Sequence, residues 1–180
     1  MEDIFKEILR LQQQLTDLEL RYWLDHVLFT FNWWFLVFIF IIPWIIWYRL
    51  VDKKRIREIL LYGFAVIVIS CLLDDLGVAI LLWAYPYELF ELSDRLNAVN
   101  LSSLPVLYML VYQYFPKWKS FFIAHIVLAL VFSFVAESIL IKMNIYVPLL
   151  WKSIYSFPIY ITIGVVVKCF TDKISRISRY

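Results

Sequence analysis

The sequence is poor in the residue types from which metal centres and many catalytic sites are built. Its 180 residues include only three glycines, two cysteines and two histidines. His26 and His125 lie far apart, and the chain has no Cys-x-x-Cys or His-Glu-x-x-His pattern, so we expect no metal and no cofactor. Cys71 and Cys169 fall in apolar segments, where a thiol behaves as a small hydrophobic group, and we expect both to be reduced and inert.

Charge is also scarce, because only 18% of the residues are charged and the net charge is +2. Hydrophobic residues make up 63% of the chain and aromatic residues 19%. The polar surface of a soluble domain of this size cannot cover so much apolar material, so membrane lipids are the expected surroundings. So small a net charge gives no reason to expect nucleic acid as a partner.

Long apolar runs predict an all-α fold, a polytopic transmembrane helical bundle of about five spans. The third run has 15 residues and reaches about 22 Å as a helix, less than the hydrocarbon thickness of about 30 Å. It is therefore short, extended at its outer end or only partly inserted, and a four-span protein with a re-entrant segment is the alternative. The predicted parts are an amphipathic juxtamembrane helix at 1–26, a transmembrane bundle at 27–170 with spans at 27–48, 59–83, 101–115, 121–141 and 154–170, and a basic cytoplasmic tail at 171–180.

Basic residues predict the orientation of the bundle. Eleven lie between 49–57, at 117–119 and between 168–179, and six lie on the other side of the predicted membrane. The positive-inside rule places the larger group in the cytoplasm. We therefore expect a multi-pass protein of the cell membrane with its N-terminus outside and its C-terminus in the cytoplasm.

The first 26 residues are acidic and amphipathic, so we expect no cleavable signal peptide. Apolar residues in this segment are spaced alternately by four and three positions, which predicts one apolar face on a helix. Such a face pairs with a copy of itself or another membrane protein, or it lies on the outer leaflet as an interfacial helix. The residues on this face are Ile4, Ile8, Leu11, Leu15, Leu18 and Tyr22.

Acidic residues inside apolar runs are the strongest pointer to a functional site. Asp74 and Asp75 lie in the run from Ile59 to Trp83, and Glu137 lies in the fourth span. A carboxylate in a bilayer has to be protonated, paired or exposed to water. Counted along the helices, Asp74 and Glu137 both rise about 22 to 24 Å from the cytoplasmic face, so we expect an outward-facing polar pocket in the outer half.

Helical spacing places Asp74 on one face with Ser70 and Gly77, which points it into the bundle, whereas Asp75 is turned away. Ser133 and Glu137 share an inward face of the fourth span. These acids either make interhelical hydrogen bonds or serve as general acids or proton carriers. The candidate pocket residues are Asp74, Asp75, Glu137, Ser133, Trp83, Tyr85, Ser102, Pro105 and Tyr160.

Four segments resemble an uncharacterised family of small multi-spanning membrane proteins of spore-forming Gram-positive bacteria. They are LVDKKRIREILLYGF from Leu50, LWAYPYELF from Leu82, SSLPVLYMLVYQYFPKWKSFF from Ser102 and IYSFPIYI from Ile154. The resemblance implies a bacterial cell membrane. A more distant likeness is to the membrane-embedded lycopene cyclase domain, with Asp75, Trp83 and Tyr85 in matching order. Valine, leucine and tyrosine follow Pro105 in place of that domain's acidic pair.

These observations favour a non-enzymatic integral membrane protein whose acidic pocket binds or passes a small or apolar ligand. Two alternatives stay open. One is an intramembrane isoprenoid or lipid enzyme with an Asp or Glu general acid, for which no catalytic residue is assigned. The other is a proton-coupled transporter.

Overall fold

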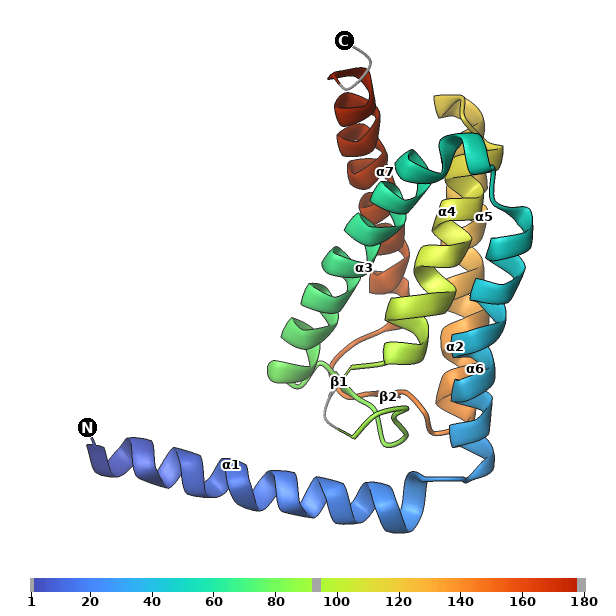
Figure 1. Ribbon diagram of the computed structural model, residues 1–180. Coiled ribbons are helices and arrows are strands. Elements are labelled where there is room, and N and C mark those ends of the chain that lie inside the picture. Colours follow the sequence, from blue (N-terminus) through green and yellow to red (C-terminus); the bar gives the residue numbers. More distant parts are fainter. Residues whose placement is uncertain (1, 92–94, 178–180) are drawn as a thin grey trace.

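The computed structural model describes residues 2–91 and 95–177, and it confirms an all-α membrane bundle (Figure 1). Short π-helical and 3-10 segments (η) interrupt or join the α-helices, and two very short strands form the only pairing between extended segments in the described part of the chain. The elements are α1 (Glu2–Tyr22), η1 (Trp23–Val27), α2 (Phe31–Leu50), η2 (Lys53–Arg55), α3 (Ile56–Ala79), β1 (Trp83–Ala84), η3 (Val99–Ser103), α4 (Leu104–Tyr114), α5 (Trp118–Leu130), η4 (Val131–Ala136), α6 (Glu137–Lys142), β2 (Val147–Pro148) and α7 (Ser153–Ile177).

Four helical stretches in the described residues are long and apolar enough to cross a membrane: Phe31–Leu50, Lys53–Ala79, Trp118–Lys142 and Ser153–Ile177. They correspond to four of the five predicted spans. Several boundaries differ from the prediction: the first stretch begins at Phe31 instead of residue 27, and the second begins at Lys53 instead of residue 59. Two ends differ as well. The second span was expected to run to residue 83, but α3 ends at Ala79 and Trp83 opens β1, whereas α7 continues to Ile177 through most of the predicted tail. Residues 178–180 of that tail lie outside the described part.

The predicted third span is the short helical stretch formed by η3 and α4. α4 lies within the bundle and buries six of its 11 residues, including Pro105, Tyr108 and Tyr112. Tyr112 stacks on Tyr62 of α3 with ring centroids 4.4 Å apart. A helix surrounded by other helices does not have to match the thickness of the lipid around it, which accounts for its length.

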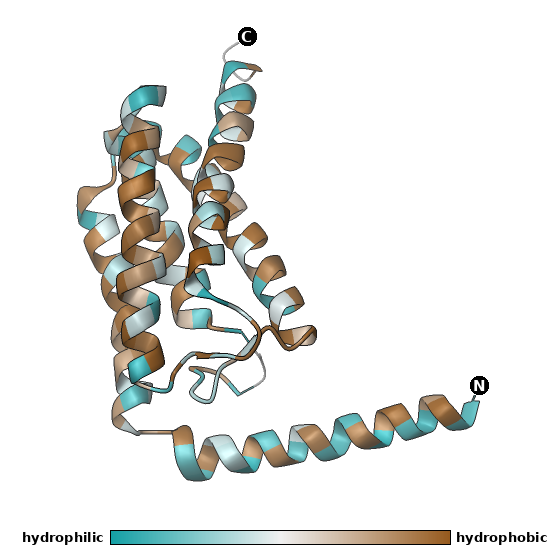
Figure 2. Ribbon diagram, turned by 180° about the vertical axis from the view of Figure 1, so that it is seen from behind, coloured by the Kyte–Doolittle hydropathy of each residue, from teal (hydrophilic) through white to brown (hydrophobic). Residues whose placement is uncertain are grey.

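The helices α2, α3 and α4, the continuous stretch from α5 to α6, and α7 alternate in direction, so the bundle has two distinct ends (Figure 1). The end at which α2 begins and α3 stops also carries β1 and β2, and we call it the β end. The other end carries η2, the start of α5 and the C-terminus of α7, and we call it the basic end. Toward the β end, α3 leans away from the rest of the bundle (Figures 1 and 2).

The predicted amphipathic helix is present as α1. It leaves the bundle at the β end and runs across the direction of the spanning helices (Figures 1 and 2). None of its residues, all of which are described, is buried. Its base is fixed to the bundle where the Trp23 indole donates a hydrogen bond to the Glu88 carbonyl, 3.1 Å away.

Candidate functional site: an acidic cavity in the bundle

A cavity of about 260 Å³ lies near the β end, between α3, α6 and α7 and beneath the segments that carry β1 and β2. Most of its wall is apolar, with contributions from leucine, isoleucine and valine side chains of five elements and loops. Two carboxylates and several aromatic rings interrupt this wall. Five of the predicted pocket residues line the cavity together: Asp74, Trp83, Tyr85, Glu137 and Tyr160.

Asp74 accepts hydrogen bonds on both carboxylate oxygens. Oδ1 accepts from the Trp83 indole at 2.9 Å and from the Tyr85 hydroxyl at 2.6 Å. Oδ2 accepts from the Leu96 backbone N–H at 3.0 Å and from the Asn100 side-chain amide. A carboxylate has about four acceptor positions, so these donors occupy all of them. Asp74 therefore binds two segments to α3, one that contains Trp83 and Tyr85 and one that contains Leu96 and Asn100.

Trp83 reaches Asp74 because of local structure on both sides of its ring. Trp83 pairs with Pro148 in the antiparallel β1–β2 ladder, which fixes the backbone position. The indole lies against Gly77, where a Cβ atom would overlap the ring. The Trp151 ring meets the other side edge to face, with centroids 5.1 Å apart. A residue without a side chain at position 77 is therefore needed for this close approach.

Tyr85 completes the same wall from the loop that follows β1. Its ring lies 5.7 Å from that of Tyr146, measured between centroids. Burial first, and the adjacent Asp74 carboxyl second, raise the pKa of the Tyr85 phenol well above its ordinary value. The phenol is therefore protonated throughout the physiological pH range and remains a hydrogen-bond donor to Asp74.

Glu137 lies across the cavity at the start of α6, and its two oxygens differ. Oε1 accepts a hydrogen bond from the Tyr160 hydroxyl at 3.2 Å. Oε2 is buried and has no hydrogen-bond partner among residues 2–91 and 95–177. The hydroxyls of Ser153 and Ser156 also lie close enough to interact with the Glu137 carboxyl. The Ser156 oxygen accepts from the Trp151 indole at 2.9 Å, which leaves its own O–H available as a donor. Glu137 is thus the acid with unused hydrogen-bonding capacity.

The cavity reaches the outer surface of the bundle along α3. Three of the residues that line it, Leu73, Leu76 and Ile80, are themselves exposed. In a membrane bundle such side chains face the hydrocarbon of the lipid. An apolar molecule in the bilayer would therefore have a lateral route into the cavity from the α3 side.

The other four predicted residues lie outside this cavity. Asp75 faces outward, where its Oδ1 pairs with Arg95 Nε at 2.8 Å. Ser102 and its neighbour Ser103 donate to backbone carbonyls of α2. Pro105 is buried in the first turn of α4, where its missing N–H is tolerated. Ser133 is fully buried in η4. Of these residues, Ser102 joins η3 to α2, Asp75 holds a loop residue, and the Ser133 hydroxyl has no hydrogen-bond partner among the described residues.

Three residues of the site were missed by sequence reasoning. Asn100 was not among the predicted pocket residues, yet its side-chain amide donates a hydrogen bond to Asp74 Oδ2. Tyr146 and Trp151 line the cavity from the connection between α6 and α7. A signal was present, because aromatic residues cluster in both loops of the β end. Only the pairing of β1 with β2 brings those loops together.

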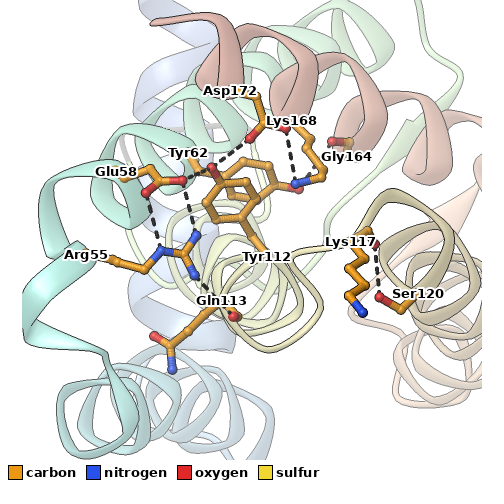
Figure 3. A network of polar contacts seen from close by, with 10 residues as sticks. All are labelled: Arg55, Glu58, Tyr62, Tyr112, Gln113, Lys117, Ser120, Gly164, Lys168 and Asp172. Atoms are coloured by element: carbon orange, nitrogen blue, oxygen red, sulfur yellow. Dashed lines mark hydrogen bonds and ion pairs between the residues drawn. The ribbon is translucent and has the colours of Figure 1, made fainter. Parts of the chain in front are cut away.

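A second polar cluster lies at the basic end (Figure 3). The Tyr112 hydroxyl of α4 lies between two carboxylates, Glu58 of α3 and Asp172 of α7, with 3.0 Å to the latter. Arg55 pairs with Glu58 at 3.1 Å, and Lys168 pairs with Asp172 at 3.3 Å. Two positive and two negative groups balance here, so the cluster ties three helices together without excess charge.

Lys168 is almost completely buried in this cluster. Its ammonium lies over the rings of Tyr112, Trp118 and Phe121, 4.6 to 5.1 Å from their centroids. Aromatic faces attract a desolvated cation, and together with Asp172 they account for its burial. The Lys168 side chain thus joins α7 to α4 and α5.

No His, Cys, Asp and Glu side chains in the described part of the chain gather into a metal-binding group of three or more. No protein-family model matches the chain, and neither the curated proteins nor the solved structures contain a match to it.

Proposed function

We propose that this protein is a non-enzymatic membrane protein that binds an amphiphilic molecule drawn from the bilayer. The observation that carries this proposal is the buried, unpartnered Oε2 of Glu137 in a cavity that reaches the lipid-facing surface. A buried acceptor without a donor is costly, by about 1 to 3 kcal/mol or more for a charged group. A ligand that donates a hydrogen bond there would remove that cost.

The chemistry of the cavity restricts the ligand. Its polar end has to offer a hydroxyl, an amide or an amine to Glu137, because each of these groups can form a hydrogen bond with the carboxyl whether it is ionised or protonated. The remainder has to be apolar, since leucine, isoleucine and aromatic side chains form the rest of the wall. The volume of about 260 Å³ is at the lower end for ligand sites. We therefore expect the head and first part of a tail to be bound, with the rest in the bilayer.

Asp74 has a different role in this proposal. Its four acceptor positions are occupied, so it is a positioning residue that holds Trp83, Tyr85 and Asn100 in the wall. The ligand then meets the aromatic faces that Asp74 orients, and its polar group meets Glu137.

We further propose that the protein resides in a bacterial cell membrane, as the family resemblance implies, with the basic end in the cytoplasm. The basic residues around η2, at the start of α5 and at the end of α7 support this orientation. The cavity would then lie in the outer half of the bilayer, and α1 would lie at the outer surface.

The test is lipid and metabolite mass spectrometry on protein extracted in native nanodiscs. We expect one compound to be enriched with the unaltered protein and depleted at least fivefold with Glu137→Gln. Asp75→Asn is the matched control, because Asp75 is an acid of the same bundle outside the cavity, and it should retain the compound. Ala136→Phe, which fills space at the cavity wall, should also lose it.

The same variants, assayed in intact membranes and in sealed vesicles, separate the alternatives. Equal profiles for all four proteins would contradict a binding function. A compound converted in membranes only when Glu137 is intact would mean an enzyme that uses this acid. Flux across vesicles that depends on pH and disappears with Glu137→Gln would mean a proton-coupled transporter.

A further inference from the structure

The further inference concerns the apolar face of α1, which is exposed. This helix has 21 residues and is about 31 Å long, and it lies across the direction of the spanning helices beside the β end (Figure 1). The apolar residues that the sequence predicts on one face of α1, Ile4, Ile8, Leu11, Leu15, Leu18 and Tyr22, form a stripe. Their side chains are between 45% and 69% exposed. A continuous apolar stripe on a helix outside the bundle calls for a partner.

Membrane geometry restricts how a second copy can cover this stripe. Two copies in one bilayer share one orientation, so a two-fold axis relating them runs along the membrane normal. Rotation by 180° about that axis reverses every direction that lies in the membrane plane. Helices that lie across the spanning direction therefore meet antiparallel in a symmetric dimer.

The spacing of the apolar residues fits an antiparallel pair without any adjustment. The stripe is symmetric about Gln13, so each apolar residue on one copy meets an apolar residue on the other. We propose that α1 of two copies forms an antiparallel coiled coil that holds two bundles together. Its layers pair Leu11 with Leu15, Ile8 with Leu18 and Ile4 with Tyr22 of the second copy.

Charged residues beside the stripe favour the same arrangement. The apolar residues follow a heptad pattern in which Ile8, Leu15 and Tyr22 occupy position a. Glu7 and Arg21 then both occupy position g, beside the apolar core. In the antiparallel register Glu7 of each copy meets Arg21 of the other, which gives two opposite-charge pairs. A parallel pair would place Glu7 opposite Gln12, so it gains no such pair.

A lipid surface is the other covering that such a stripe could have. α1 contains five acidic and three basic residues, so the anionic leaflet of a membrane offers it no electrostatic attraction. The helix also places opposite charges where a second copy needs them. Self-association is therefore the reading that the sequence of α1 supports better.

Cysteine cross-linking in membranes of expressing cells tests the pairing, because all copies there share one orientation. The background carries Cys169→Ala, which removes the exposed native thiol and leaves the buried Cys71. With a short bismaleimide, Gln14→Cys should cross-link to itself, because it lies near the two-fold axis. Ile4→Cys should not, because its two copies would be about 27 Å apart.

In a third experiment, the Ile4→Cys and Tyr22→Cys variants are expressed together. We expect the cysteine of one variant to cross-link to the cysteine of the other. Self-linking of Ile4→Cys would instead indicate a parallel pair and would overturn the proposal. No linking at any of these positions would mean that lipid covers the stripe, and it would overturn the proposal as well. The background protein without an added cysteine controls for links through Cys71.

Charge exchange provides a readout that needs no cysteine. Glu7→Arg or Arg21→Glu alone should weaken dimerisation about tenfold, and the two together should restore it. Lys6→Glu is the matched control, because it reverses a charge on the same helix at a residue that pairs with Glu2 instead of with Glu7 or Arg21, and it should leave the dimer unchanged. Single-molecule photobleaching in supported bilayers measures the dimer fraction, and unchanged fractions for all variants would contradict the register.

Discussion

Asp74 and Asp75 are neighbours in the sequence, but the helix places them in opposite surroundings. Asp74 points inward and accepts hydrogen bonds from four donors, whereas Asp75 is partly exposed beside Arg95. Glu137 is buried like Asp74, but its Oε2 atom is without a close hydrogen bond from the described residues, whereas each oxygen of Asp74 accepts two. Burial alone therefore does not distinguish these two acids. They differ in the number of acceptor positions that hydrogen bonds occupy.

The first prediction concerns this contrast between the two aspartates. Asp74→Asn replaces acceptor positions with an amide N–H₂ that faces other donors, and we expect a loss of about 2 to 4 kcal/mol in the free energy of unfolding. Asp75→Asn removes one partly exposed ion pair and should cost less than about 1 kcal/mol. Unfolding in mixed micelles measures both. Equal losses would mean that the four hydrogen bonds of Asp74 contribute little.

The second prediction is that Glu137→Gln hardly changes stability. The substitution keeps the shape of the side chain and its contact with Tyr160, and it removes a charge that lacks a full set of partners. Sites built for binding often gain stability when such a group is neutralised. We expect a change within about 0.5 kcal/mol of zero, or an increase. A loss as large as that of Asp74→Asn would identify Glu137 as a packing residue.

Sequence spacing correctly predicted that Asp74, Ser133 and Glu137 are buried, because helical period alone fixes which residues share a face. It named Trp83 and Tyr85 as residues of the same pocket, but it could not predict that they bind Asp74, because all four donors reach it through tertiary contacts of the segment from β1 to η3. Asn100 and Tyr85 lie in segments without a periodic pattern. Their approach to Asp74 depends on the β1–β2 pairing, for which four residues provide almost no sequence signal.

At the scale of elements, the hydroxyl of Tyr112 links α4 to both α3 and α7. The third prediction is that Tyr112→Phe lowers the free energy of unfolding by about 1 to 3 kcal/mol, because Glu58 and Asp172 then lose their shared donor. Tyr114→Phe is a matched control on the same helix, since Tyr114 is exposed, and it should be neutral. Similar values for both would exclude the phenol as a tie between helices.

Hydropathy predicted every membrane-spanning element, because it measures apolar character, which a segment needs in order to lie in the bilayer. It failed at the end of α3, where residues 80–83 are as apolar as the helix before them and only their conformation differs. Leu81 adopts a positive φ of 57°, which ends the helix and turns the chain toward β1. Apolar composition carries no information about such a turn.

At the scale of the whole molecule, the two ends of the bundle differ in how tightly α3 is packed against its neighbours. At the basic end, Tyr62, Tyr112 and the charged cluster hold α3 against its neighbours, whereas at the β end α3 borders the cavity. The fourth prediction is that backbone amides of α3 around Gly77 exchange hydrogen faster than those around Tyr62, which mass spectrometry can resolve. Uniform protection along α3 would mean that both ends are equally rigid.

The periodicity of residues 4–22 predicted a helix with an apolar stripe, but it left the partner open. The direction in which α1 leaves the bundle is a property of the assembled molecule, set by η1 and by the contact of Trp23 with Glu88. Only with that direction known does symmetry select an antiparallel pair over a parallel one.

The four hydrogen bonds of Asp74 also bear on how the chain enters the membrane during synthesis. All four donors follow Asp74 in the sequence, between Trp83 and Asn100. An aspartate at the centre of an inserting helix costs about 2.5 to 3.5 kcal/mol. Asp74 lies nearer the end of α3, so its cost is smaller, but none of its partners has been made when α3 inserts. We therefore expect α3 to insert poorly in nascent chains that end near residue 83, and to become stably inserted once residues as far as Asn100 have left the ribosome.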